Sequence, residues 1–219
     1  MRCPVAERKV AALFVAPDGP YMGLPHVDPW TEARDARLYP GPYPVVAHPP
    51  CERWGRYWFG GPSVKERKRL GDDHGCFGFA LMCVRAFGGV LEHPAATHAW
   101  KVYELASPPI YGGWHPAGDG VGMVCHVEQG QYGHPARKAT WLYAVAPTLP
   151  ELIWGPSMNK KRLDEGFHSK EERRLARLSG KKPIPRLSKR ENVHTPILFR
   201  DALVKIALDS RSRDGGKGR

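Results

Sequence analysis

One short stretch combines a rigid backbone with a candidate nucleophile. Residues 45–55 read Val-Val-Ala-His-Pro-Pro-Cys-Glu-Arg-Trp-Gly, an apolar run that stops at two prolines and a single cysteine. Because proline fixes its own φ and holds the residue before it extended, the backbone that leads to Cys51 has few conformations. A thiolate on such a backbone is suited to nucleophilic catalysis. The alternative is an ordinary buried turn, in which Pro-Cys pairs also occur.

Two further stretches supply a carboxyl group and a pair of cations. Residues 90–94 (Val-Leu-Glu-His-Pro) form a short apolar run that ends in Glu92. A turn at residues 132–136 leads through Arg137 and Lys138 into another apolar run. A carboxyl group can act as a general acid, and a nearby cation favours a thiolate. As alternatives, Glu92 is a structural carboxylate that caps a turn, and the basic pair is simply solvated.

In this order the three stretches resemble the cytosine-C5 DNA methyltransferase family, with its Pro-Cys nucleophile loop, Glu-Asn-Val strand end and Tyr-Gly-x-Pro-Gln-Arg-Arg motif. The resemblance extends from about residue 40 to residue 208, and each motif is kept only in part. The family's Gln-x-Arg-x-Arg aligns with Ala136, Lys138 and Thr140. Glu-Asn-Val has become Glu92-His93-Pro94, and the glutamine after the nucleophile has become Glu52.

The resemblance implies catalytic roles for Cys51, Glu92, Arg137 and Lys138. Cys51 would add to carbon 6 of a cytosine that is flipped out of the duplex, which makes carbon 5 enamine-like. Glu92, with a raised pKa, would contact N3 and the exocyclic amine of the base. Arg137 or Lys138 would hold the O2 atom of the base and lower the pKa of the thiol.

The resemblance also implies S-adenosylmethionine as the methyl donor, bound beside the first strand. In the family that strand leads into a glycine-rich turn at a helix N-terminus, but residues 17–23 hold two prolines, which lack the N–H donors of such a turn. Residues 23–45 leave little room for a helix, the ribose-binding strand of the family and a further crossover. The acids available in that segment are Asp28, Glu32 and Asp35. The residues assigned to the cofactor are Phe14, Asp18, Gly19, Asp35 and Pro49.

Apolar periodicity places the candidate site on an α/β fold. Residues 74–87 repeat apolar side chains at helical spacing, and Gly88-Gly89 ends that helix. The helix connects two short apolar runs, so Cys51 and Glu92 are predicted at the carboxyl ends of two parallel strands of a βαβ unit. Strands are predicted at residues 9–16, 44–47, 90–91, 121–127 and 140–145. We predict a Rossmann-like methyltransferase fold with a mainly parallel sheet, reduced at its N-terminal cofactor half and followed by a basic C-terminal segment.

The remaining segments predict loops and three helices. Residues 17–30 and 94–123 are rich in proline and glycine and predict loops. Ser63 to Glu66 is a capping-box pattern that could begin a short basic helix through Arg69, and residues 170–178 could form another helix. Thr195 as N-cap, with Pro196 at the first helical position, predicts an amphipathic helix to about Asp209.

The positive charge is concentrated near the C-terminus. The chain carries a net charge of +11, and residues 160–219 hold 18 Lys and Arg against 8 Asp and Glu. Such a segment binds polyanions, above all nucleic acid, unless it is only a solvated tail. Aromatic and basic residues alternate in residues 53–59 and could stack on bases, or could pack that loop onto the core. The residues assigned to DNA binding are Arg53, Trp54, Arg56, Lys160, Lys161, Arg162, Lys181 and Lys182.

These features predict four parts of the chain: a catalytic core at 1–155, a basic DNA-recognition segment at 156–194, a helix at 195–209 that packs on the core, and a disordered tail at 210–219. Five scattered cysteines favour a reducing cytoplasm. No apolar run reaches the roughly 18 residues of a membrane span. We expect a monomer that binds DNA, without a membrane, metal or protein partner. His48 and Cys51 with His74 and Cys76 could ligate zinc, but their spacing matches no common module.

Three functions are therefore considered. The first is DNA cytosine-C5 methylation with a shortened cofactor site. The second is a related pyrimidine-modifying enzyme that uses another donor or acts on a free nucleotide. The third is a non-catalytic DNA-binding protein on the same scaffold, against which Cys51 and Glu92 together argue, since binding requires neither.

Overall fold

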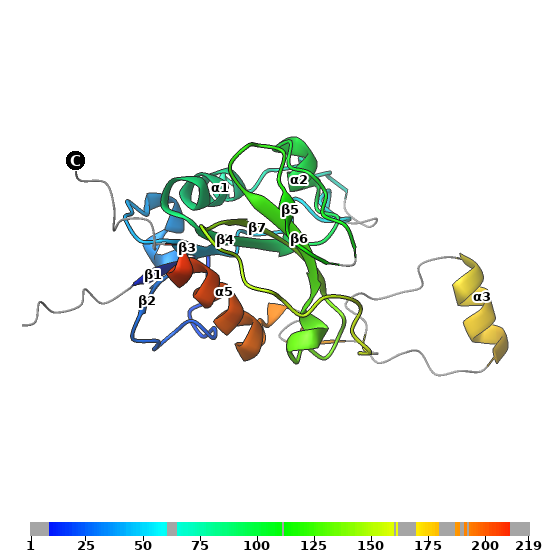
Figure 1. Cartoon of the computed structure of the whole chain (residues 1–219). Coiled ribbons are helices and arrows are strands. Elements are labelled where there is room, and N and C mark those ends of the chain that lie inside the picture. Colours follow the sequence, from blue (N-terminus) through cyan, green and yellow to red (C-terminus); the bar gives the residue numbers. More distant parts are fainter. Residues whose placement is uncertain are drawn as a thin grey trace, which may run out of the picture.

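A seven-stranded sheet forms the centre of the protein (Figure 1). The computed structural model describes residues 9–60, 65–110, 112–159, 161, 170–179, 187–188, 191 and 193–210. The strands are β1 (Val10–Leu13), β2 (Val27–Trp30), β3 (Val45–Ala47), β4 (Gly89–Pro94), β5 (His115–Pro116), β6 (Met123–Glu128) and β7 (Ala139–Val145), and their order in the sheet is β2-β1-β3-β4-β7-β6-β5.

The sheet is mixed, so the predicted α/β class is confirmed but the predicted mainly parallel sheet is wrong. β2, β1, β3 and β4 pair in parallel, whereas β4 with β7, β7 with β6, and β6 with β5 pair antiparallel. The reason lies in the connection between β6 and β7, which is a 3-10 turn at Gln129–Tyr132 followed by six residues. A parallel crossover needs a dozen or more residues, so β7 must return antiparallel to β6.

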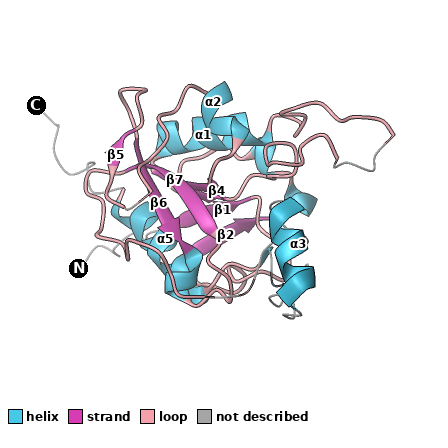
Figure 2. Cartoon of the chain, turned by 90° about the vertical axis from the view of Figure 1, so that its right-hand side faces the viewer, coloured by secondary structure: helices cyan, strands magenta, loops and turns pink. Residues whose placement is uncertain are grey.

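Helices cover both faces of the sheet (Figures 1 and 2). Helix α1 (Cys76–Phe87) and the short helix α2 (His98–Val102) lie on one face, and α5 (Ile197–Asp209) lies on the other, against β3 and β4. Side chains alternate between the two cores along each strand: in β3, Val45 and Ala47 pack with α1, and Val46 packs with α5. Helix α3 (Lys170–Ser179) stands apart from the sheet in Figure 1.

The unit β3-α1-β4 has the predicted form. β3 and β4 are hydrogen-bonded in parallel, with Val46 opposite Val90, and α1 connects them. The carboxylate of Asp73 fixes the start of α1 because it accepts hydrogen bonds from the N–H groups of Gly75 (3.0 Å) and Phe77 (2.8 Å). Cys51 follows β3, and Glu92 lies in the second half of β4. Both residues therefore lie at the edge of the sheet where these two parallel strands end.

Several local predictions are corrected. Residues 17–30 contain strand β2, and residues 94–123 contain α2 and β5. The side chains of β2 are only partly buried, so this edge strand lacks the apolar run that identifies buried strands. Helix α5 begins at Ile197 with Pro196 as its N-cap, and not with Thr195.

Some predicted segments lie partly or wholly outside the described residues. Residues 65–69 form no helix, and residues 63–64 of the capping-box pattern are outside the described part. The predicted tail beyond Ser210 and much of the predicted DNA-recognition segment are outside it as well. Where the structure describes the chain, no helix has the length and apolar character to cross a membrane.

A close approach between β3 and β4 generates a first prediction. Gly89 has φ +112°, and a Cβ atom there would lie 1.9 Å from the carbonyl oxygen of Val45. Gly89→Ala must therefore separate the two central strands, and we expect a loss of at least about 3 kcal/mol in the free energy of unfolding, measured in urea. In Gly55→Ala the nearest atom is 3.6 Å away, so this control should change stability by less than about 1 kcal/mol. Equal unfolding midpoints for the two variants would contradict the tight pairing.

Candidate active site

The loop of residues 48–55, which we call the nucleophile loop after its candidate nucleophile Cys51, begins where β3 ends. The N–H of His48 donates to the carbonyl of Leu13 in β1 (3.0 Å), which continues the ladder by one residue. Two prolines follow, and the carbonyl of Cys51 then accepts hydrogen bonds from the N–H groups of Trp54 and Gly55, both at 3.0 Å. The side chain of Cys51 is exposed at this turn. The backbone around the thiol is thus fixed on both sides.

Trp54 anchors the same loop to the helices. Its side chain is buried, and its Nε1–H donates to the carboxylate of Asp73 (2.8 Å), the same group that fixes the start of α1. Its carbonyl accepts from the N–H of His98 at the start of α2 (2.9 Å). The prediction that Trp54 binds nucleic acid is corrected, because an indole in the core has no face free to stack on a base.

Glu92 lies in β4 and both of its carboxylate oxygens accept hydrogen bonds. His48 Nδ1 lies 2.9 Å from Oε2, and Gln129 Nε2 donates to Oε1 at 3.1 Å. The same Gln129 nitrogen donates to Thr140 Oγ1 at 3.0 Å. The side chains of His48 and Glu92 are only 14% and 13% exposed. This pair joins the carboxyl ends of β3 and β4. From the sequence, His48 was considered only as a possible zinc ligand, so the contact with Glu92 was not predicted.

Burial raises the pKa of Glu92, but the hydrogen bond and charge of His48, together with the charge of Lys138, outweigh burial and hold that pKa below its usual value. The predicted raised pKa of Glu92 is therefore wrong in direction. The sequence suggested the burial of Glu92, which raises the pKa, but it did not reveal the contact with His48, which lowers the pKa. Glu92 is a carboxylate at neutral pH.

Lys138 is the cation beside Cys51 and Glu92. It lies directly before β7, and its Nζ donates to the carbonyl of His194 (2.8 Å). Burial lowers the pKa of Lys138, while the negative charges of Glu92 and Cys51 act in the opposite direction. Because β7 runs antiparallel to β4, the first residues of β7 lie beside the last residues of β4, with Thr140 opposite Pro94. The antiparallel pairing thus brings Lys138 to the edge of the sheet that carries Cys51 and Glu92.

Arg137 has a different partner. Its Nε donates to both carboxylate oxygens of the buried Glu128, at 2.9 and 2.8 Å, and its terminal nitrogen also contacts that carboxylate. The N–H of Ser157 donates to the same group (2.8 Å). Arg137 therefore holds the β6–β7 connection to the segment after β7. Of the two cations that the sequence offered, Lys138 is the one whose charge acts on Cys51.

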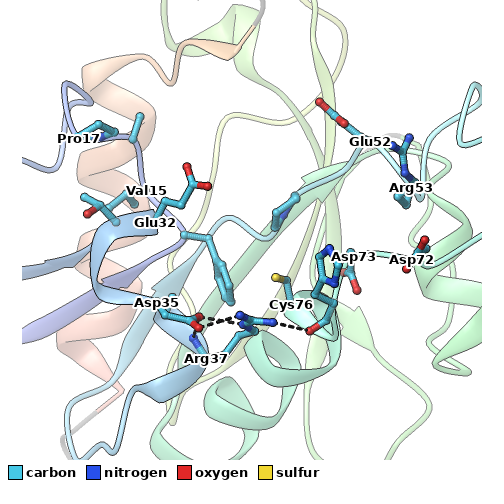
Figure 3. A pocket seen from close by; sticks show the side chains of 16 residues that line it. Val15, Pro17, Glu32, Asp35, Arg37, Glu52, Arg53, Asp72, Asp73 and Cys76 are labelled. Atoms are coloured by element: carbon cyan, nitrogen blue, oxygen red, sulfur yellow. Dashed lines mark hydrogen bonds and ion pairs between the residues drawn. The ribbon is translucent and has the colours of Figure 1, made fainter. Parts of the chain in front are cut away.

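A cavity of about 770 Å³ opens where β1, β2 and β3 end (Figure 3). In Figure 3, Glu32 and Asp35 project from one side, and Glu52, Arg53, Asp72 and Asp73 lie on the other. Arg37 binds Asp35 and donates to the carbonyl of His74. Five carboxylates thus face two guanidinium groups. The sixteen residues that line this cavity are Phe14, Val15, Ala16, Pro17, Thr31, Glu32, Asp35, Ala36, Arg37, Pro50, Glu52, Arg53, Asp72, Asp73, His74 and Cys76.

The lining includes two of the five residues assigned to the cofactor. Phe14 and Asp35 line the cavity, whereas Asp18, Gly19 and Pro49 do not, and Pro50 does. Glu32 also lines it, just beyond the end of β2. The sequence offered Glu32 as one of three acids but placed no strand before it. Residues 27–30 (Val-Asp-Pro-Trp) do not alternate and include a proline, so they gave no clear strand signal.

A second cavity of about 430 Å³ lies on the other side of the nucleophile loop. Cys51, Gly55, Arg56 and residues 93–98 line it. Pro50 and Glu52 line the first cavity, and Cys51 between them lines the second. The thiol therefore stands at the boundary between two spaces, each large enough for a small molecule or a base.

The residues assigned to DNA binding are distributed differently. Arg53 lines the first cavity and Arg56 the second. Lys161 forms an ion pair with Glu191 (2.9 Å). Lys160, Arg162, Lys181 and Lys182 lie outside the described residues. Among the described residues, no three His, Cys, Asp or Glu side chains are grouped so that they could hold a metal ion.

Comparison with known proteins gives no match. No protein-family model, no curated protein and no solved structure matches the chain. The function is therefore argued from the geometry of the site.

The electrostatics of Cys51 generate a second prediction. Although the side chain of Cys51 reaches the surface, desolvation by the neighbouring protein, first of all, and the charge of Glu92 raise the pKa of Cys51, while Lys138 lowers it. The rate of alkylation of Cys51 by iodoacetamide should therefore still rise with pH above about 9. Lys138→Met should raise the pKa further and slow alkylation about threefold to tenfold at pH 8, followed by peptide mass spectrometry. In the control Lys205→Met, on the outer surface of α5, the rate should not change; an equal effect of both variants would exclude a local action of Lys138.

Proposed function

We propose that the protein is a cytosine-C5 DNA methyltransferase that adds the Cys51 thiolate to carbon 6 of a flipped cytosine. One observation carries the proposal: Cys51, Glu92 and Lys138 come from three separate segments and meet at one sheet edge, where the charges of Glu92 and Lys138 both act on the pKa of Cys51. A Rossmann-like methyltransferase fold is part of this proposal. The four parallel strands and the β3-α1-β4 unit support it.

The three groups match the needs of the first chemical step. Carbon 5 of cytosine is a poor nucleophile until a thiolate adds to carbon 6 and the electrons of the ring move toward N3. As the S–C6 bond forms, a proton donor at N3 takes up the developing negative charge, and this is the role of Glu92. Lys138 stabilises the thiolate and the charge on the O2 atom of the base.

The two cavities suit two reactants. The smaller one, of about 430 Å³, is lined by Cys51 and Arg56 and has room for a flipped base with its phosphate nearby, whereas Glu92 and Lys138 lie outside its lining. DNA in preference to a free nucleotide is supported by the charge of the C-terminal quarter of the chain. A binding protein without catalysis would have no use for a buried carboxylate held at the edge of a strand beside a thiol.

The larger cavity fits S-adenosylmethionine in size and in charge. Its volume of about 770 Å³ lies within the range of ligand pockets, and its five carboxylates suit a molecule with sulfonium and ammonium groups. Glu32 beyond β2 would bind the ribose hydroxyls, and Phe14 would contact the adenine or ribose. The bound cofactor would supply an electrophilic methyl group. The acidic lining makes an anionic donor, such as a folate, the weaker alternative.

Adduct formation tests the thiolate chemistry. In the presence of S-adenosylmethionine, oligonucleotides of mixed sequence that contain 5-fluorodeoxycytidine should become covalently attached, because fluorine replaces the proton that must leave carbon 5 before the thiolate can be eliminated. The intact mass should show one adduct, absent in Cys51→Ala and kept in Cys83→Ala, because Cys83 is a buried residue of α1. With S-adenosylmethionine present, the adduct should be one methyl group heavier. An adduct without the methyl group would favour another donor, and no adduct would favour a binding protein.

Cofactor binding tests the larger cavity. Glu32→Gln should weaken the binding of S-adenosylmethionine about 10- to 100-fold in calorimetry, since a hydrogen bond to a charged group contributes about 1.5–3 kcal/mol. Asp18→Asn should leave the affinity unchanged, because Asp18 does not line the cavity. If Asp18→Asn weakens binding and Glu32→Gln does not, the cofactor lies elsewhere.

A further inference from the structure

A chain of hydrogen bonds extends from Glu92 away from both cavities. His48 uses both ring nitrogens: Nδ1 lies 2.9 Å from Glu92 Oε2, and Nε2 lies 2.8 Å from the hydroxyl of Tyr21. Tyr21 is 2% exposed, in the loop between β1 and β2. Arg200 of α5 donates to the carbonyl of Pro20 (2.7 Å) and thereby fixes that loop. The hydrogen bonds thus connect Glu92 to the end of β3, to the loop between β1 and β2, and to α5.

The partners of His48 determine its protons. A carboxylate only accepts hydrogen bonds, so Nδ1 of His48 carries a proton that it donates to Glu92. A phenol both donates and accepts, so Tyr21 can donate to neutral Nε2 or accept from a protonated one. Burial, first of all, and the nearby charge of Glu92 raise the pKa of Tyr21 well above its usual value, so its hydroxyl stays neutral. Tyr21 therefore accommodates both protonation states of His48.

Glu92 alone cannot supply the proton that the proposed reaction needs. Both of its oxygens accept hydrogen bonds, and its pKa is held below the usual value although burial raises it. Yet N3 of the base must receive a proton, or a strong hydrogen bond, as the thiolate adds to carbon 6. A second proton source must therefore act through this carboxylate.

We infer that His48 is a positioning residue that supplies the proton which Glu92 passes to N3, with Tyr21 holding the imidazole in line. The inference rests on the proposed function. As the S–C6 bond forms, the electrons of the C5–C6 double bond move toward C4 and those of the C4–N3 double bond move to N3. The proton passes from Nδ1 of the imidazolium to Glu92 and from Glu92 to N3. His48 becomes neutral and keeps its proton on Nε2, and the elimination that ends the cycle returns the proton by the same route.

Other charged groups also act on this pair. Each of them either interacts electrostatically with Glu92 or lies near Tyr21, at the far end of the hydrogen-bond chain. These groups are Cys51 after β3, His93 in β4, Lys138 before β7, and Arg200 and Asp201 in α5. Of the described contacts, one joins His48 to Glu92 by a hydrogen bond, and none joins Tyr21 or these charged neighbours to Glu92 in that way. The test must therefore change His48 and leave the other charges in place.

The experiment compares two trapped bases in His48→Gln and the native chain. Oligonucleotides of mixed sequence carry either 5-fluorocytosine or 5-azacytosine, and the rate of adduct formation is measured from pH 6 to 9 with S-adenosylmethionine present. The ring nitrogen of 5-azacytosine makes carbon 6 more electrophilic, so thiolate addition to it needs less help from a proton donor. We expect His48→Gln to slow the adduct with 5-fluorocytosine at least about tenfold and the adduct with 5-azacytosine less than about threefold. The pH profile of the rate should also differ between the native chain and the variant.

Two further variants separate positioning from packing. Tyr21→Phe keeps the ring and removes the hydroxyl, and it should slow the 5-fluorocytosine adduct in the same direction by a smaller factor. The control Tyr132→Phe also removes a buried hydroxyl, which accepts from the N–H of Ile153 (2.9 Å), and it should leave both rates unchanged. An equal loss with both bases, or an unchanged pH profile in His48→Gln, would overturn the role of His48.

A readout without catalysis separates this inference from the proposed function. In a carbon-13 NMR titration, His48→Gln should raise the pKa of Glu92, because burial then acts without its main opponent. An unchanged pKa of Glu92 would overturn the coupling between the two residues. If the pKa rises but the native chain forms no adduct with any oligonucleotide, the coupling stands and the proposed function fails, and with it the proton route to N3.

Discussion

The buried carboxylate of Glu92 is the constraint on which the site depends. Its two oxygens accept from His48 at the end of β3 and from Gln129 beyond β6, so one side chain joins the ends of three strands. A buried charge without partners would be costly, and removing either partner would take the hydrogen bond from one of the two carboxylate oxygens. The rest of the site is arranged around a group that has to be paired. The same pairing holds the pKa of Glu92 below its usual value and, in the route that we infer, makes His48 the source of the proton.

A second carboxylate, that of Asp73, fixes the nucleophile. It joins the indole of Trp54 in the nucleophile loop to the first turn of α1, so the helix and the loop are held by one group. The thiol of Cys51 is exposed at the end of this braced loop, between two cavities. In the reaction that we propose, Cys51 meets two reactants and benefits from a rigid support, because a small displacement would favour one cavity over the other.

The mixed sheet is what makes this arrangement possible. Parallel strands β3 and β4 deliver their carboxyl ends to one edge, and there they place His48, Cys51 and Glu92. Lys138 precedes its strand, so it reaches the same edge only because β7 runs in the opposite direction. Gln129 follows β6, which is antiparallel to β7 and therefore again points to that edge. In a fully parallel sheet, Lys138 would lie at the far end of β7.

The sequence by itself determined the local backbone and offered the candidate reactive groups. Two prolines before Cys51, helical spacing over residues 74–87 and two glycines after them define the β3-α1-β4 unit, since these signals act between near neighbours. Only the tertiary structure decided the direction of β7, the existence of β2, the choice of Lys138 over Arg137, and the partner of Glu92. Alternation along a strand is the same for parallel and antiparallel pairing, and a buried ion pair depends on residues far apart in the chain. The His48–Glu92 contact spans 44 positions, and no short-range pattern could have revealed it.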